Sequence, residues 1–310
     1  RAVINAGEIA NKGIEASLSF VPVKTKNFTW DASVNFAKND NEVVKLHDEV
    51  KDFELASARW ANASIYASEG QPYGVIVGKK LKRTEKGDVI FENGLPTFDD
   101  KVSVLGNGNY DFTLGFRNAF NYKNLSMSVL FDMKFGADIY SMSAMQSHVN
   151  GTSKETLEGR QEWYSSEQKR QSAGVPAGNW IATGGYVGKG VMAIKNDDGE
   201  MIYVPNNVCV DPAKYWQALQ TTSPEPFIYD NSFVKLREIS LSYNCPKKWF
   251  VHTPIESITL SAYGRNLLLI YSNVDNIDPE SSYNNGNGQG FEYGSLPSRR
   301  TFGFGINVKF

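Results

Sequence analysis

Apolar and polar residues alternate along seven separate stretches of the chain. At the end of the sequence, Phe302, Phe304 and Ile306 share one parity, and Gly303, Gly305 and Asn307 share the other. The same period of two occurs in residues 13–20, 28–36, 111–120, 125–135, 239–243 and 258–262. Because successive side chains of a strand point to opposite faces, the pattern predicts seven β-strands, each with one apolar face.

The connections between these strands alternate between short and long. The short ones cover residues 22–27, 121–124 and 245–256, and the long ones cover about 41–109, 136–231 and 272–298. A meander with short turns at one end and long loops at the other is typical of outer-membrane β-barrels. If Phe310 ends in the periplasm, counting back along the strands places every long loop outside the cell.

Charged residues keep to one face of the predicted strands. With one exception, the apolar faces carry no Lys, Arg, Asp or Glu, and the polar faces carry Glu15, Asp31, Asp111, Arg117, Asp132, Lys134 and Arg265. An Arg or Lys that faces lipid at mid-membrane costs about 2–4 kcal/mol, so the apolar faces suit lipid and the polar faces a watery lumen. A soluble β-sandwich has the reverse geometry, and alternation alone does not separate the two. The one-sided loop lengths and the aromatic end favour the barrel.

The exception is the stretch that contains Ile239. Its apolar parity would fall on Arg237 and Lys235, although Leu236 and Val234 are the apolar residues there. One extra residue restores the alternation, which predicts a β-bulge near Leu236–Ile239, or a strand that leaves the membrane at that point.

Composition and strand number indicate that the seven predicted strands are part of a larger barrel. Aromatic residues make up 13% of the 310 residues and there are 27 glycines, which suits an all-β protein with tight turns. Bacterial single-chain barrels have an even number of strands, from eight upward, and seven strands leave two unpaired edges. The chain also starts at Arg1 with no methionine or signal peptide. We therefore expect these strands to belong to a larger barrel.

Several classes of function have no support in the sequence. The net charge is -2, which gives no basic field for nucleic acid. The two cysteines form no CxxC motif and the three histidines are scattered without metal-ligand spacing. No nucleophile–base set lies in the strands. The sequence predicts no catalytic residue, no metal site, no cofactor and no enzyme activity.

Eight motifs resemble the SusC/RagA family of TonB-dependent outer-membrane transporters. They include "NKGIEASLSF", "EGQPYGVIVG", "NSFVKLREISLSYNCP", "SAYGRNLL", "NIDPES" and the closing "TFGFGINVKF", in the order in which the family has them. The combination of "SFVKLREISLSY" with Arg265-Asn266-Leu267 and Asp278-Pro279-Glu280 is the most specific. Tyr110, where a proline is usual, and Ala137, where a second glycine is usual, depart from the pattern at strand–loop junctions.

The resemblance implies an all-β, antiparallel transmembrane β-barrel, of which residues 1–310 would be the C-terminal portion. The whole barrel would have 22 strands and an N-terminal plug, both the plug and the first strands being absent from this chain. It would import oligosaccharides or peptides across the outer membrane of a Gram-negative bacterium, with energy from TonB. Its partners would be a SusD-like surface lipoprotein that caps the long loops, and outer-membrane lipid and lipopolysaccharide.

Two sets of candidate site residues follow. The long loop after Asp138 carries five aromatic residues that could stack on a ligand or contact the lid lipoprotein, or instead form the loop's own small core: Trp163, Trp180, Tyr186, Tyr203 and Trp216. Phe310 resembles the C-terminal signal by which the assembly machinery recognises a barrel, and otherwise it is a plain lipid-facing residue.

Two further segments carry clustered charges. Residues 78–91 predict a hairpin with its turn near Glu85–Asp88, whose lysines could meet an anionic ligand or simply be solvated. Asp275, Asp278 and Glu280 offer too few regularly spaced oxygens for a calcium loop, and the resemblance treats them as a structural loop motif.

Three hypotheses about function stay open at the level of sequence. The first is a TonB-dependent importer, and the second is a passive porin or adhesin with the same wall but no energy coupling. The third is a soluble all-β enzyme or lectin domain. The substrate, glycan or peptide, is not encoded in any motif of this chain.

Overall fold

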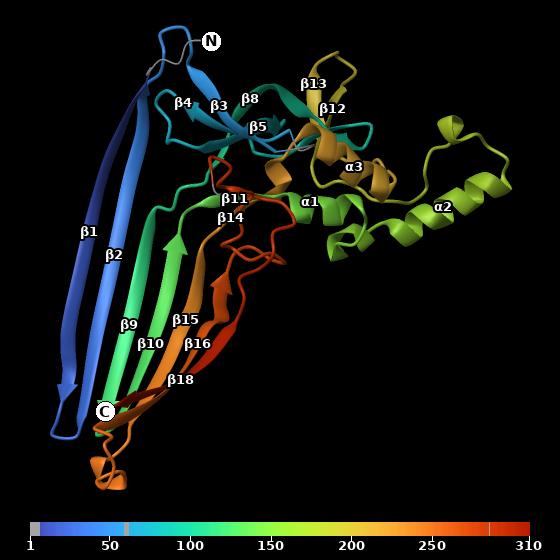
Figure 1. The fold of residues 1–310 in the computed structure, drawn as a ribbon. Helices are drawn as coiled ribbons and strands as arrows, with labels where there is room; N and C mark the ends of the chain where they lie inside the picture. The colour runs from blue at the N-terminus through green and yellow to red at the C-terminus, as the bar shows by residue number, and fades with distance from the viewer. Residues whose placement is uncertain (1–6, 59–61, 285) are drawn as a thin grey trace, which may run out of the picture.

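Seven long strands form one antiparallel sheet in the computed structural model, which describes residues 7–58, 62–284 and 286–310. Each long strand pairs with the long strands before and after it in the chain, so the sheet is a simple meander (Figure 1). The strands in order are β1 (Glu8–Lys24), β2 (Phe28–Lys45), β9 (Phe112–Tyr122), β10 (Leu125–Phe135), β15 (Phe233–Asn244), β16 (Ser257–Ser272) and β18 (Thr301–Lys309). The seven predicted strands are confirmed.

The short and long connections lie at opposite ends of the sheet, as predicted (Figure 1). The short turns cover residues 25–27, 123–124 and 245–256, and the long segments cover 46–111, 136–232 and 273–300. The first turn begins later than expected, because β1 continues through Pro22 to Lys24. The pairing of β1 with β2 shifts between Phe20 and Val23, which accommodates a proline that has no N–H to donate.

One face of the sheet is a continuous apolar surface in which aromatic rings form rows across the strands. Trp30 stacks on Phe120 at 5.9 Å between ring centroids, Phe112 on Phe135 at 5.1 Å, and Phe116 on Phe131 at 6.4 Å. The face also contains Asn118, which is 7% exposed and whose Oδ1 accepts a hydrogen bond from Trp30 Nε1 at 3.1 Å. The indole therefore both covers and satisfies the polar group.

The long connections fold into a separate layer above one end of the sheet. It contains α1 (Met142–Val149), α2 (Arg160–Ser172), α3 (Pro212–Thr222) and three small sheets. The first small sheet contains β3 (Asp52–Ser57), β4 (Ser64–Ser68), β5 (Val75–Leu81) and β8 (Phe98–Asn107). The second contains β13 (Met201–Pro205), β12 (Val191–Lys195), β6 (Ile90–Glu92) and β7 (Leu95–Pro96), and the third contains β14 (Ile228–Asp230), β11 (Asp138–Ser141) and β17 (Phe291–Glu292).

This layer has its own hydrophobic core. The core draws from all three long connections and contains Ala63, Ile65, Ile76, Tyr140, Met142, Met145, Trp216, Leu219, Phe227 and Phe291. Because segments distant in sequence share one core, the layer is a folded cap and its parts hold each other in place. No helix in the described part of the chain is long and apolar enough to cross a bilayer.

The predicted basic hairpin is confirmed within this layer. Arg83 pairs with Val89, and the turn closes through hydrogen bonds from Thr84 N to Asp88 O at 2.9 Å and from Gly87 N to Thr84 O at 2.9 Å. Arg83 forms an ion pair with Glu225 at 2.8 Å, which ties the hairpin to the segment that precedes β14.

Candidate functional site

A β-bulge at Arg237 turns two cations of β15 toward the same side of the sheet. Leu130 of β10 pairs with Glu238 and the next residue, Phe131, pairs with Leu236, so Arg237 is the extra residue. The ladder between β15 and β16 skips the same residue. Lys235 then pairs with Asp132, on the polar face. The bulge predicted from the broken alternation is confirmed, and its effect is to keep both cations off the apolar face.

Both cations bind the acidic turn Asp278-Pro279-Glu280. Lys235 Nζ lies 2.5 Å from Asp278 Oδ1 and 2.7 Å from Glu280 Oε2. Arg237 holds Glu280 through two hydrogen bonds, Nη1 to Oε2 at 2.9 Å and Nη2 to Oε1 at 2.6 Å. Such a bidentate pair fixes orientation as well as distance. The connection from β16 to β18 is thereby fastened to β15.

Neighbouring groups complete this ionic network. Arg237 Nη2 also contacts Asp132 of β10, and Arg237 Nη1 donates to Asn266 Oδ1 at 2.8 Å. Lys235 is only 4% exposed, so its charge depends on its two carboxylate partners. The residues that carry the most specific part of the family resemblance in sequence are therefore in contact in space.

Hydrogen bonds to Asp278 outweigh the effect of its burial. Burial alone would raise the pKa of this carboxyl, but Lys235, Ser298 and the amides of Glu280 and Ser298 donate to it, and its pKa falls from 3.8 to about 2. Burial also opposes ionisation of Glu280, and hydrogen bonds from Arg237 and Lys235 lower its pKa below the usual 4.5. Both carboxylates are therefore ionised and fully engaged at neutral pH.

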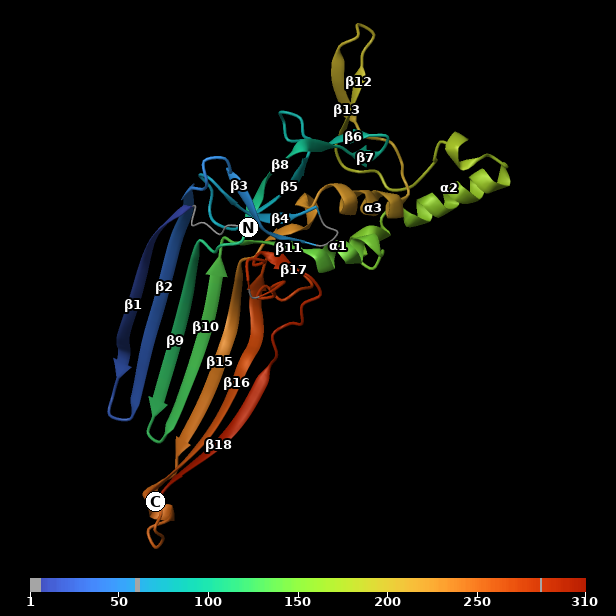
Figure 2. The ribbon, with the colours of Figure 1, turned by 45° about the horizontal axis from the view of Figure 1, so that its top comes forward.

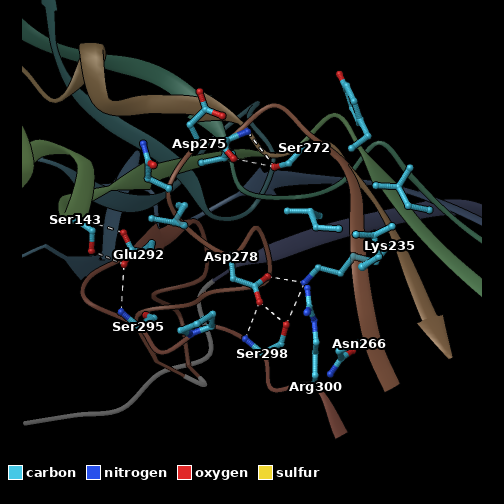
Figure 3. A pocket seen from close by; sticks show the side chains of 18 residues that line it. Ser143, Lys235, Asn266, Ser272, Asp275, Asp278, Glu292, Ser295, Ser298 and Arg300 are labelled. Atoms are coloured by element: carbon cyan, nitrogen blue, oxygen red, sulfur yellow. Dashed lines mark hydrogen bonds and ion pairs between the residues drawn. The ribbon is translucent and has the colours of Figure 1, made fainter. Parts of the chain in front are cut away.

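A cavity of about 550 Å³ lies between this network and a second polar cluster (Figure 3). The second cluster is centred on Glu292, which is 1% exposed and accepts hydrogen bonds from Ser141 Oγ at 2.8 Å, Ser143 Oγ at 2.7 Å and Ser295 N at 3.2 Å. The remaining walls come from β16 and from the chain that leads into β18, including Leu268, Leu269, Ile270, Tyr271, Ser272, Pro297 and Arg300. A volume of this size is within the range of ligand-binding pockets.

The five predicted loop aromatics do not form a single site. Trp163 and Trp216 line another pocket of about 470 Å³, between α2 and the start of α3. Tyr186 packs near Trp216, at 6.1 Å between ring centroids. Trp180 instead donates from Nε1 to Ser166 Oγ at 3.0 Å, and Tyr203 is 54% exposed on the β12–β13 hairpin, which projects away from the cap (Figure 2).

The aromatics thus divide between the two readings that the sequence left open. Trp216 belongs to the core of the cap, Trp163 is half-buried and Tyr203 is exposed. Whether any of them contacts a ligand or a lid stays a prediction. Phe310 follows the last residue of β18 and is 76% exposed, and its role as an assembly signal also stays a prediction.

Curated relatives of the chain are TonB-dependent receptors. It is 26% identical to TonB-dependent receptor P3 of Formosa agariphila over 99% of its own length, and 26% identical to receptor P26 of the same organism, also over 99%. It is 27% identical over 40% of its length to TonB-dependent receptor SusC of Bacteroides thetaiotaomicron. The RagAB peptide transporter structure superposes on 99% of the chain, with a TM-score of 0.61 and 17% identity. The chain is therefore similar to TonB-dependent receptors of the SusC/RagA type.

The matches also define what part of the family fold this is. The chain spans 29% and 30% of the two Formosa receptors and 30% of the RagAB chain it matches. Its fold is a segment of an antiparallel transmembrane β-barrel with long loops at one end. No family model matches the sequence.

Proposed function

We propose that this chain is the C-terminal part of an outer-membrane nutrient importer of the SusC type. A plug and the remaining strands of a barrel would lie in other parts of the same protein. The importer would take up oligosaccharides or peptides with energy supplied through TonB. The single observation that carries the proposal is the similarity to TonB-dependent receptors over 99% of the chain.

The geometry supports a role at the mouth of a transporter. Every long connection lies at one end of the sheet, and together they form a cap with a shared core. The apolar face of the sheet suits lipid, while the polar face carries Lys134, Asp132 and Arg117. We infer that the cap faces the outside of the cell and that a SusD-like surface lipoprotein covers it, which the similarity to receptor SusC and to the RagAB peptide transporter supports.

Uptake by whole cells tests the proposal. Cells that express the full protein should accumulate labelled oligosaccharides or peptides, and the accumulation should stop when TonB is deleted. A passive porin would continue to admit the label without TonB, and an adhesin would bind it at the surface without accumulation.

Fractionation and purification test the location and the partner. The full protein should be found in the outer membrane and should need detergent for extraction, which a soluble domain would not. A surface lipoprotein should co-purify with the full protein from native membranes. Deleting the projecting residues 191–205 and repeating the purification tests whether the lipoprotein contacts this part of the cap.

A further inference from the structure

The cavity beside the ionic network is bounded by the backbone edge of a strand. Five consecutive residues of β16, Leu268 to Ser272, line it. Neighbouring side chains of a strand point to opposite faces, so a pocket that meets five in a row meets the edge of the strand and not one face. The exposed fractions agree, since Leu268 is 51% exposed, Leu269 40%, Ile270 49% and Tyr271 45%.

This edge has no strand beside it in the described part of the chain. The pairing of β16 with β18 ends at Arg265 and Thr301, whereas β16 continues to Ser272. No backbone hydrogen bond joins residues 267–271 to the chain that approaches β18, within the described residues. Ser295, Pro297, Ser298 and Arg300 of that chain instead line the cavity (Figure 3).

The free edge lies beyond the part of β16 that crosses the membrane. A membrane-spanning strand needs about 9–11 residues. β18 has nine residues, and they pair with Ser257–Arg265 of β16. Residues 267–271 therefore extend past the hydrocarbon layer on the side of the long loops, where an unpaired strand edge can be hydrated and can accept a partner.

We propose that this edge binds a short extended peptide, which adds to β16 as an extra strand. This deepens the proposed function, on which it rests, by assigning the substrate class and a site. An oligosaccharide lacks the regularly spaced N–H and C=O groups that such an edge pairs with, whereas any peptide has them. Five residues of β16 span roughly 16 Å, which limits the added strand to a similar length.

Both ends of the edge are closed, which favours a free peptide over a strand of a folded partner. At the lower end, Asn266 Nδ2 donates to Arg299 O at 3.1 Å, just above the start of β18. At the upper end the chain turns back, with Val274 N donating to Ser272 Oγ at 3.1 Å and Asn273 N to Ser232 O at 3.1 Å. A strand that continued into a folded domain would have to pass one of these closures.

Charge in the cavity adds a preference. Lys235, Asp278 and Glu292 are engaged with one another or with hydroxyl and amide groups, as described above. Arg300 lines the cavity and forms no ion pair among the described residues. A peptide with an acidic residue or a free carboxylate near one end would complement it.

The experiment uses the full receptor, purified in detergent with any lipoprotein that accompanies it. The probe is a fluorescein-labelled pentapeptide of alternating Thr and Val that ends in Asp. Its partner is the same pentapeptide with N-methyl groups on alternate backbone nitrogens, which removes the donors on one edge and leaves the side chains unchanged. Anisotropy should show binding of the first probe and at least tenfold weaker binding of the second, because two or more hydrogen bonds are lost. Equal affinity for the two probes would overturn strand addition.

Two adjacent arginines give a matched pair of variants. Arg300→Glu should weaken binding of the probe that ends in Asp at least fivefold, whereas Arg299→Glu should leave it within twofold, because only Arg300 lines the cavity. Equal effects of the two variants would contradict the assigned site. Amide hydrogen exchange at residues 267–271 should be fast without probe and slow with it.

The remaining outcomes separate this inference from the proposed function. Slow exchange at residues 267–271 without probe would mean that another part of the same receptor covers the edge. Probe binding only after removal of the lipoprotein would mean that the lipoprotein covers the edge. Either result overturns the inference. TonB-dependent uptake of an oligosaccharide without any binding of the peptide probe overturns the inference alone. Probe binding without TonB-dependent uptake contradicts only the proposed function.

Discussion

Replacing Lys235 with methionine should release the loop between β16 and β18. The side chain of Lys235 is 5% exposed and that of Asp278 is 9% exposed, so the variant leaves a buried carboxylate without its cation. Removing one member of a buried ion pair costs about 3–5 kcal/mol. Asp278 would keep its bonds to Ser298 and to the amide of Glu280, at 2.7 Å and 3.1 Å, so the lower part of this range applies.

The pKa of Asp278 gives a second estimate, of how strongly all of its partners together hold it ionised. It falls from 3.8 to about 2, and one pKa unit corresponds to about 1.4 kcal/mol, so the charged form is favoured by roughly 2–3 kcal/mol. This figure already includes the opposing effect of burial. The two estimates together place the cost of Lys235→Met at about 2–4 kcal/mol of local opening free energy.

Amide hydrogen exchange measures this local opening directly. The amides of Glu280 and Ser298 donate to Asp278, so they exchange when the network opens. A loss of about 2–4 kcal/mol should speed their exchange by roughly thirtyfold to several hundredfold.

Arg265→Met is the matched control for that experiment. Arg265 pairs with Glu238, but its side chain is 60% exposed and that of Glu238 is 31% exposed, and solvent-exposed ion pairs contribute little to stability. The control should leave the Glu280 and Ser298 amides unchanged. Similar exchange rates in the two variants would refute the view that the network holds the loop.

Three further predictions concern pH, the apolar face and the terminus. The folded-state pKa of Asp278 is about 2 and its ordinary value is 3.8, so its contribution to stability is complete above pH 3.8 and is lost as pH falls toward 2. The exchange rate of the Ser298 amide, measured by pulse labelling and corrected for the intrinsic rate, should therefore be constant from pH 7 to 4 and rise below pH 4. A rise between pH 7 and 5 would exclude this carboxyl as the cause. Trp30→Phe should destabilise the barrel by about 1–3 kcal/mol in urea titrations, because Asn118 loses its hydrogen-bond donor in an apolar face. The double variant Trp30→Phe with Asn118→Leu should recover most of that lost stability. No recovery would mean that packing of the indole is what matters. Phe310→Ala should lower the amount of folded receptor in the outer membrane, measured by its heat-modifiable migration in gel electrophoresis, and Phe302→Ala should leave that amount unchanged. Equal effects of the two variants would mean that Phe310 is an ordinary lipid-facing residue.

The barrel wall was predictable because its signal is local. In a strand with lipid on one side and water on the other, every second residue reports the environment, so the sequence of β18 alone shows its two faces. The bulge was predictable for the same reason, since Lys235 and Arg237 broke the alternation within a few residues. Even the error at Pro22 was small, because a bulge lets β1 absorb a residue that cannot donate.

The ionic network was not predictable as a site because its partners are far apart in sequence. Lys235 and Asp278 are separated by 43 residues, and a strand alternation contains no information about which loop returns to it. One signal was present in the sequence. Lys235 and Arg237 occupy positions where the alternation calls for apolar residues, so they need acidic partners, and "DPE" is an acidic run in the next long loop. The aromatics of the cap were harder still, since a loop aromatic has the same sequence signature whether it forms a core, as Trp216 does, or is exposed, as Tyr203 is.

The bulge, the network and the free strand edge form one causal sequence. If β15 ran on from Ile239 without the bulge, both Lys235 and Arg237 would face the apolar side, and neither could hold the acidic turn. The acidic turn draws the chain before β18 toward β15, because Asp278 also binds Ser298. Since that chain is held there, it cannot run beside the upper part of β16, and the edge from Leu268 to Ser272 stays unpaired. The network therefore does more than stabilise a loop: it keeps open the cavity that the strand edge borders. Lys235→Met should then weaken binding of the pentapeptide probe as well as release the loop, although Lys235 need not touch the peptide.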